Sequence, residues 1–134
     1  MEEITFQRPE GLVNSRAFSH LVVIPPSATT IHVGGQNAVN AEGALIGGGD
    51  IAAQVRQVMG NLETALAAAG ATIADLVSWS ILLVEGVDSW TAYSVAASAL
   101  DPERDPPIVT VARVAGLAVE GALVEVSATA AVLR

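Results

Sequence analysis

Residues 31–36 read Ile-His-Val-Gly-Gly-Gln, residues 47–50 read Gly-Gly-Gly-Asp, and residues 51–70 read IAAQVRQVMGNLETALAAAG. This stretch decides the fold because a short apolar strand, a glycine-rich loop and a long helix follow one another directly. The apolar positions of the last segment recur three or four residues apart, which predicts one buried stripe along a helix. Asp50 suits the N-cap of this helix, and Gly70 suits a left-handed turn at its end.

The glycine run before the helix admits two interpretations. A glycine-rich loop at a helix N-terminus can bind phosphate. Here the Lys-Ser/Thr ending of a phosphate loop is missing, and Asp50 places negative charge where the phosphate would lie. We therefore favour a flexible turn with a cap. Gln54 and Asn61 share one stripe of the helix, so we expect them to hydrogen-bond backbone groups at the edge of the buried face.

The rest of the chain alternates apolar strands with one further helix. A strand with period two covers Leu76–Val84, and a second helix begins at the cap Asp88 and continues to about Leu100. The other expected strands are Ile4–Phe6, Leu21–Ile24, Thr30–Val33, Ile108–Val114 and Ala122–Val132. We expect the second and third strands to form a hairpin-like pair through residues 25–28.

The order of elements predicts an α+β fold: a mixed β-sheet of about six strands with two helices packed on one face, in a single domain over residues 1–134. Val and Leu residues remain on the other face of the sheet, and no third layer is left in the sequence to cover them. Burial alone therefore predicts that other subunits cover this face.

Composition excludes several classes of function. The formal net charge is −8, and the six arginines are scattered without a basic run, which argues against a nucleic-acid partner. Cysteine and lysine are both absent, so thiol and Schiff-base chemistry are excluded. We expect no cofactor and no metal site. No apolar run is long enough to span a bilayer, and an acidic N-terminus without an apolar core argues against a signal peptide, so we expect a cytoplasmic protein.

Short motifs, taken in order along most of the chain, resemble the YjgF/RidA/UK114 family, also called L-PSP endoribonuclease-like. They are Phe18-Ser19-His20, Gly34-Gly35-Gln36, Gly49-Asp50 with Gln54 and Asn61, Asp88 with Trp90, Pro106-Pro107, and residues 121–126, which read GALVEV. The resemblance implies a chorismate mutase-like homotrimer with a central β-barrel and small-molecule clefts between subunits. It also implies hydrolysis of reactive enamines and imines such as 2-aminoacrylate.

Carried over residue by residue, the resemblance makes Glu125 the group that positions the attacking water. Alternation places Glu125 on the same side of its strand as Ser127 and Thr129. The family pattern also has an arginine after the prolines to hold the substrate carboxylate, and here Ile108 stands in its place. This chain is therefore a divergent member that lacks the usual active-site arginine. A neutral or cationic amine-derived ligand should fit it better than a 2-imino acid.

Several further positions are implied as binding residues. Gly35 keeps the family residue, and Thr110 matches a position that lines the family cleft. Three positions depart from the family: Phe18 replaces a tyrosine, Gly34 a serine and Ser94 an asparagine. Trp90 and Tyr93 could stack on a ligand, although we favour core packing under the second helix. His32 should face opposite to its apolar neighbours Ile31 and Val33.

Three arginines could replace the missing clamp. Arg113 lies five residues after Ile108, so it faces the other side of the strand unless a bulge intervenes. Arg104 lies in the preceding loop, and Arg16 could reach from an adjacent subunit. The sequence thus favours a RidA-like hydrolase or deaminase with altered specificity. The alternative is a non-catalytic small-molecule-binding or regulatory trimer, and endoribonuclease activity is not expected from so acidic a chain.

Overall fold

The computed structural model describes residues 2–134 and contains six strands and two α-helices. In chain order the elements are β1 (Thr5–Gln7), β2 (Leu21–Val23), β3 (Ala28–Gln36), α1 (Ile51–Ala68), a 3-10 turn (Ile73–Asp75), β4 (Leu76–Val84), α2 (Ser89–Ala97), β5 (Ile108–Val114) and β6 (Val124–Leu133). The predicted α+β class and the element order are confirmed.

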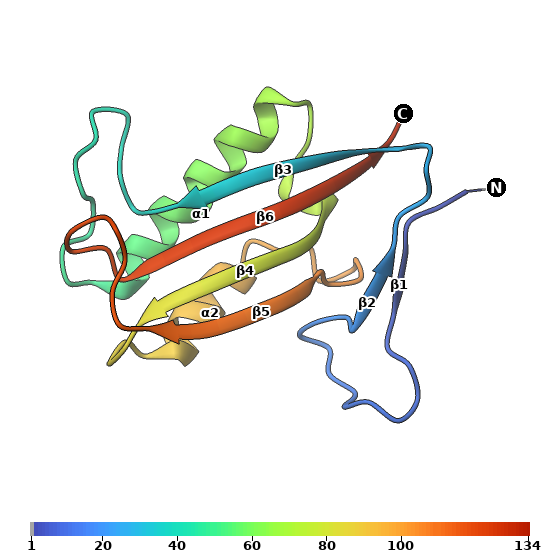
Figure 1. The fold of residues 1–134 in the computed structure, drawn as a ribbon, viewed down its shortest axis with the longest axis horizontal. Helices are drawn as coiled ribbons and strands as arrows, with labels where there is room; N and C mark the ends of the chain where they lie inside the picture. Colours follow the sequence, from blue (N-terminus) through green and yellow to red (C-terminus); the bar gives the residue numbers. More distant parts are fainter. Residues whose placement is uncertain (1) are drawn as a thin grey trace.

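The strands form two sheets rather than one. A four-stranded sheet has the order β3-β6-β4-β5, with β4 and β5 parallel and β6 antiparallel to both of its neighbours. Both helices lie on one side of it, while β1 and β2 form a separate antiparallel ribbon beside the sheet (Figure 1). The expected single mixed sheet of about six strands is therefore corrected to a four-stranded mixed sheet and a separate two-stranded ribbon.

The predicted hairpin between the second and third strands is wrong. Strand β2 pairs with β1, and β3 pairs with β6 from Ala28 opposite Leu133 to Gln36 opposite Val126. Two prolines, Pro25 and Pro26, separate β2 from β3, and neither has an N–H to donate to a ladder. The backbone instead turns there, with Ala28 N donating to Pro25 O at 3.1 Å.

Helix α1 begins and ends at the predicted caps. Asp50 Oδ1 accepts a hydrogen bond from Ala53 N at 3.2 Å. At the other end Gly70 has φ +73°, and its N–H and that of Ala71 return to the carbonyls of Ala67 and Leu66. This is a Schellman ending, which needs a residue that tolerates positive φ. The buried stripe is confirmed and comprises Gln54, Val55, Val58, Met59, Leu62 and Leu66.

Helix α2 is shorter than predicted and faces the core differently. It ends at Ala97, and its fully buried residues are Ala92 and Ala96. Tyr93 is partly buried and packs against the core as expected. Trp90 is 77% exposed, so the expectation that it packs in the core is wrong. The alanines fit this position because small side chains let a helix approach its neighbours closely.

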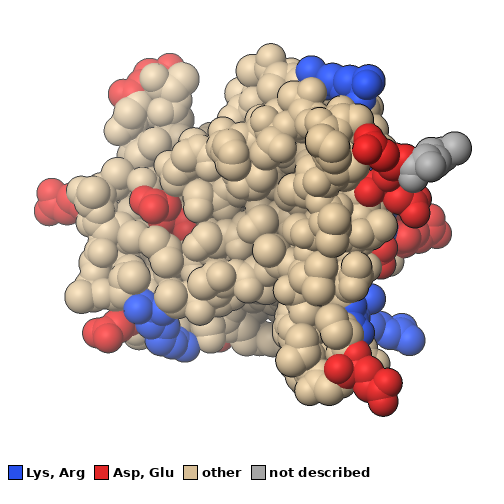
Figure 2. Space-filling view, turned by 45° about the vertical axis from the view of Figure 1, so that its right-hand side comes forward, with Lys and Arg blue, Asp and Glu red and all other residues tan. Residues whose placement is uncertain are grey.

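The core lies between the helices and one face of the sheet. Alternate residues of β4 and β6 are buried there, including Trp79, Ile81 and Val126. The residues between them are half-buried on the opposite face, which no helix of the described chain covers (Figure 1). Figure 2 shows a mainly uncharged surface, with charged side chains lying mostly toward its margins. Among residues 2–134, no helix is both long and apolar enough to cross a membrane.

Candidate functional site

Glu125 lies against the backbone of Gly35. A Cβ atom at Gly35 would lie 2.7 Å from both Cδ and Oε2 of Glu125, far closer than carbon atoms approach in proteins. The close approach occurs where the register between β3 and β6 shifts, between Val33 and Gln36. A larger residue at position 35 would therefore displace the Glu125 carboxylate from this position. Gly34 has nothing within 4 Å of its Cβ position, so the surroundings leave room for a larger residue there.

Strand β6 places Glu125 on the face of the sheet opposite the helices. Its flanking residues Val124 and Val126 are buried in the core, whereas Glu125 and Ser127 are half-buried. The predicted shared face with Ser127 and Thr129 is confirmed by this alternation. The position of Glu125 is therefore set by the regular pleat of a strand anchored on both sides by core valines.

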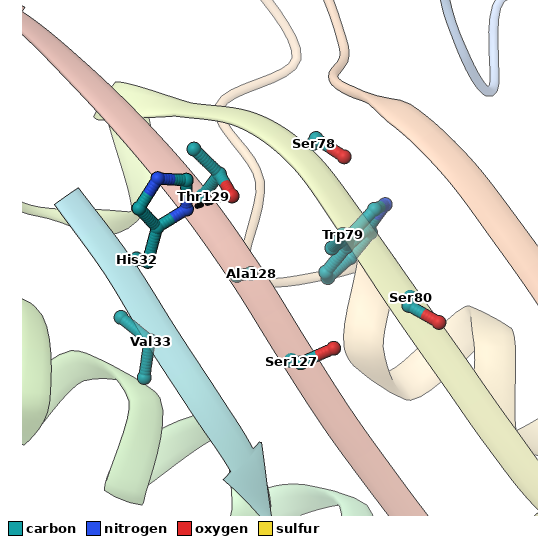
Figure 3. Close-up of a pocket in the computed structure, with 8 residues that line it drawn as sticks. All are labelled: His32, Val33, Ser78, Trp79, Ser80, Ser127, Ala128 and Thr129. Carbon is teal, nitrogen blue, oxygen red and sulfur yellow. Dashed lines mark hydrogen bonds between the residues drawn. The ribbon is translucent and has the colours of Figure 1, made fainter. Parts of the chain in front are cut away.

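A polar hollow of about 260 Å³ lies on the same face of the sheet, and Ser127, two residues after Glu125, is among its lining residues. Its polar side chains are His32, Ser78, Ser80, Ser127 and Thr129 (Figure 3). The register explains their proximity, because three strands bring these residues opposite one another: His32 and Ser78 both pair with Thr129, and Ser80 pairs with Ser127. His32 Nδ1 and Thr129 Oγ1 are 3.1 Å apart.

The hollow contains no carboxylate, arginine or lysine among its lining residues. Hydroxyl groups both donate and accept hydrogen bonds, so this lining suits neutral polar groups better than ions. Sequence reasoning placed Ser127 and Thr129 beside Glu125 but missed Ser78 and Ser80. The alternation of serine with core residues in β4 was the available signal.

A second group of predicted residues gathers at the start of β5. Ser19 ties the N-terminal loop to the proline pair, since its Oγ donates to Pro106 O at 2.7 Å and its N to Pro107 O at 3.4 Å. These bonds hold the neighbouring Phe18 near the beginning of β5, which starts at Ile108. Ile108 and Thr110 pair with Ser78 and Ser80, so both lie on the same sheet face as Glu125.

The single chain does not bring Ile108 and Glu125 together. Glu125 lies opposite Leu82, which in turn pairs with Ala112, four residues beyond Ile108 on β5. Four residues of strand and two strand spacings separate the two positions by about 16 Å. Residues from both groups can therefore meet around one small ligand only across an interface between two copies of the chain.

The predicted residues of α2 lie on the other side of the sheet from Glu125. Trp90 is exposed, and Ser94 is half-buried. The neighbouring Tyr93 packs toward Trp79, with ring centroids 6.3 Å apart. Within the single chain neither Trp90 nor Ser94 reaches the Glu125 group.

Arg113 does not replace the missing clamp. It pairs with Leu83 and so faces the helices, as the odd spacing from Ile108 predicted, and the register of β5 on β4 runs without a bulge. Its guanidinium donates to Val87 O and Ser89 Oγ, each at 3.0 Å. Arg113 thus fastens β5 to the start of α2. Arg16 and Arg104 line a separate pocket beside α2.

The buried amide of Gln54 connects α1 to the strand that carries Glu125. Its Nε2 donates to Gly48 O at 2.6 Å and Gly121 O at 3.0 Å, and its Oε1 accepts from Leu123 N at 2.8 Å. Asn61 bonds the carbonyls of Asn37 and Val39 in the same manner. The expectation that both side chains bond backbone groups is confirmed, and Gln54 fixes the chain two residues before Glu125.

Comparison with known proteins defines the family. Residues 10–132 match the family described as Endoribonuclease L-PSP. The chain belongs to this family, as the sequence motifs indicated.

Among solved structures, YyfB of the Rid family from Yersinia pestis, a protein of unknown function, is 35% identical, with a TM-score of 0.83 over 96% of this chain and 98% of that chain. Rv2704 from Mycobacterium tuberculosis, of the YjgF/YER057c/UK114 family, is 29% identical, with a TM-score of 0.64 over 97% of this chain and 100% of that chain. RidA from an Antarctic Psychrobacter species shares the fold at 23% identity, with a TM-score of 0.69 over 90% of this chain and 98% of that chain. No functionally curated protein matches the chain.

Proposed function

We propose that this protein is a RidA-like hydrolase that acts on an imine, an enamine or a related small molecule in clefts between the subunits of a homotrimer. Family membership supports a small-molecule-processing role of the RidA kind in general. The observation that carries the proposal is the Glu125 carboxylate held against Gly35, because it fixes one possible base beside an open backbone segment.

The trimer is part of the proposal because the candidate residues fall into two groups. Glu125 with Gly34 and Gly35 forms one group, and Phe18 with Ile108 and Thr110 forms the other, about 16 Å away on the same protomer. A cleft that joins the first group of one copy to the second group of the next copy would hold both. The uncovered sheet face supplies the surface for such an assembly.

The chemistry assigned to the cleft is hydrolysis of a carbon–nitrogen double bond. Water adds to the iminium carbon while the Glu125 carboxylate accepts one of its protons, which gives a carbinolamine and a protonated carboxyl. Return of that proton to the carbinolamine nitrogen makes ammonia the leaving group and regenerates the carboxylate. The carbon–nitrogen bond then breaks as the carboxylate accepts the hydroxyl proton, which leaves a carbonyl, and the departing ammonia takes that proton as ammonium. A carboxylate suits these transfers because it can act as base and then as acid.

The substrate class follows from Ile108. A hydrogen bond to a charged group contributes about 1.5–3 kcal/mol. Loss of an arginine clamp therefore weakens the binding of a 2-imino acid by about ten- to a hundredfold. The uncharged hollow beside Glu125 offers hydroxyls instead. We infer that the substrate is neutral or cationic and carries a polar, uncharged substituent.

A competition assay tests the activity. Imines are generated in situ by an amine oxidase, and 2-imino acids by an amino-acid oxidase, with semicarbazide present to trap whatever is not hydrolysed. The protein should divert the imines from an amine oxidase faster than the 2-imino acids, and Glu125→Gln should abolish the effect. Equal trapping with and without protein for both substrate sets would refute hydrolysis. Light scattering should give three times the 13.6 kDa chain mass.

A non-catalytic binding or regulatory trimer is the second candidate. The substitution of Ile108 for the cationic clamp favours it, because the family chemistry on imino acids needs that cation. The two candidates separate when a ligand binds with wild-type affinity to Glu125→Gln and no substrate is turned over. The formal charge of −8 gives no support to an endoribonuclease.

A further inference from the structure

A small pocket beside α2 gathers two arginines of this acidic chain. It has a volume of about 180 Å³ and lies between the loop around Arg16, the second half of α2 and the loop that contains Arg104. The chain has only six arginines and no lysine at a formal net charge of −8. Two arginines that line one pocket therefore form a local reversal of the overall charge.

The arginines sit on segments that are held in place. Tyr93 of α2 donates its hydroxyl to Ala17 O at 2.9 Å, which fixes the residue next to Arg16. Burial raises the pKa of Tyr93 above its ordinary value, so this hydroxyl remains a donor and adds no negative charge. The loop of Arg104 is closed by a turn, in which Arg104 N donates to Asp101 O at 3.1 Å.

Donor capacity remains on the guanidinium groups. Arg104 Nη1 reaches the Ala74 carbonyl only at 3.5 Å, the outer limit of a hydrogen bond. Asp101 also lines the pocket, but its Oδ1 accepts from Glu103 N at 2.9 Å within its own loop. The lining residues of this pocket therefore carry a net charge of +1, and Arg104 also borders a neighbouring pocket that Glu3 and Asp75 line.

The remaining walls are apolar. Ala97 and Leu100 of the α2 side and Pro106 of the loop line the same space. The volume is below that of sites for drug-sized ligands, so only a small molecule fits. Planar guanidinium groups bind carboxylate and phosphate oxygens in pairs, and apolar walls favour a hydrocarbon body.

We propose that the pocket between Arg16, Arg104 and α2 binds a small anion with an apolar body, either a carboxylate or a phosphate monoester. The site lies on the helix side of the sheet, away from Glu125, and the proposal does not depend on the hydrolase assignment. Pro106 lies in this pocket and two residues before Ile108, so an occupant touches the segment that leads into β5.

Titrations of the intact protein at low ionic strength, followed by amide NMR shifts, test the proposal. Benzoate and phenyl phosphate are the probes. We expect shift changes centred on Tyr93, Leu100 and Arg104, at least tenfold weaker binding in Arg16→Gln and Arg104→Gln, and further weakening with salt. Arg56→Gln, on an exposed part of α1, is the matched control and should bind as wild type.

The two probes separate the sources of the anion. Binding of benzoate alone assigns the pocket to carboxylates, binding of phenyl phosphate alone assigns it to phosphate monoesters, and binding of both supports the shared chemistry. If neither benzoate nor phenyl phosphate binds, the proposal is overturned. Unchanged affinity in a folded Arg16→Gln, Arg104→Gln double variant also overturns the proposal. Shift changes centred elsewhere on the wild-type protein overturn it as well, and this second readout does not require any variant to fold.

Discussion

The carboxylate of Glu125 rests on the backbone of Gly35, where no other side chain would leave it room. An added Cβ would meet Cδ and Oε2 of Glu125 at 2.7 Å. The two residues come from β6 and β3, whose partner positions lie about a hundred residues apart in the sequence. A glycine in a strand often marks such a close approach. The pair therefore links a backbone feature of β3 to the orientation of the candidate base.

Replacement of Gly35 by alanine should displace Glu125 without unfolding the protein. The clashing atoms belong to a flexible side chain, so the free energy of unfolding should change by less than about 1 kcal/mol. Hydrolysis of the amine-oxidase-generated imines should fall at least tenfold, because general-base catalysis depends on placement. Gly116→Ala, outside the candidate site, is the control, since nothing lies within 4 Å of its Cβ position either. Equal activity in the two variants would contradict the proposed role of the pair.

Gln54→Leu should be among the more destabilising single changes in α1. The leucine removes three hydrogen bonds from a side chain that is 0% exposed and leaves the Gly121 carbonyl and the Leu123 N–H without their partner. Buried groups left unsatisfied cost about 1–3 kcal/mol each. Urea unfolding at neutral pH measures the loss, which should reach at least 2 kcal/mol.

Gln57→Leu provides the control for the helix itself. Gln57 lies one turn further on, is half-buried and makes one side-chain bond to Asn61 Oδ1 at 2.9 Å. Its loss should cost about 1 kcal/mol or less. If the two substitutions were equally mild, the amide of Gln54 would not hold the start of β6.

Local pattern predicted most elements because their signals lie within a few residues. Strands β4 and β5 have the predicted bounds, and α1 lies between the predicted Asp50 cap and the predicted Gly70 turn. The pairing of β3 with β6 was not predictable, since a strand pattern does not name its distant partner. The exposure of Trp90 was missed for a related reason: the buried side of α2 is set by what it packs against, and the alanines there give only a weak signal.

The candidate site was predictable only in pieces. The resemblance singled out Glu125 and Ile108, but no sequence feature reveals that they lie about 16 Å apart in one protomer. The hollow of His32, Ser78 and Ser80 was also missed, because serines between core residues look like the ordinary solvent side of a strand. The register of the strand pairs, rather than residue type, sets both the separation of Glu125 from Ile108 and the grouping of side chains in the hollow.

Asp88, the N-cap of α2, should make the thermal stability of the protein depend on pH. Hydrogen bonds from the Thr91 hydroxyl and backbone, with a smaller effect of Arg113, hold the pKa of Asp88 below its ordinary value of 3.8. A carboxyl group whose pKa is lower in the folded state stabilises the protein above pH 3.8. This contribution is lost as the pH falls through the lower, folded-state pKa. Wild type and Asp88→Asn should therefore converge in thermal stability at acid pH and diverge at neutral pH. Asp105→Asn, in an exposed loop, should show no such trend; a constant difference between wild type and Asp88→Asn would argue against the cap as the cause.

Ile108→Arg tests whether the cation is the missing part of the cleft. Ile108 lies on the same sheet face as Thr110 at the start of β5, so an arginine there can extend over the open face and pair with a substrate carboxylate. We expect the KM for 2-imino acids to fall by about ten- to a hundredfold, while activity on neutral imines declines. Ile108→Gln is the matched control, because it supplies length and polarity without charge, and should leave 2-imino acids poor substrates. The gain should also fade with added salt, as an ion pair requires. An equal gain from glutamine, or no gain from arginine in a folded trimer, would show that Ile108 does not set the specificity of the site.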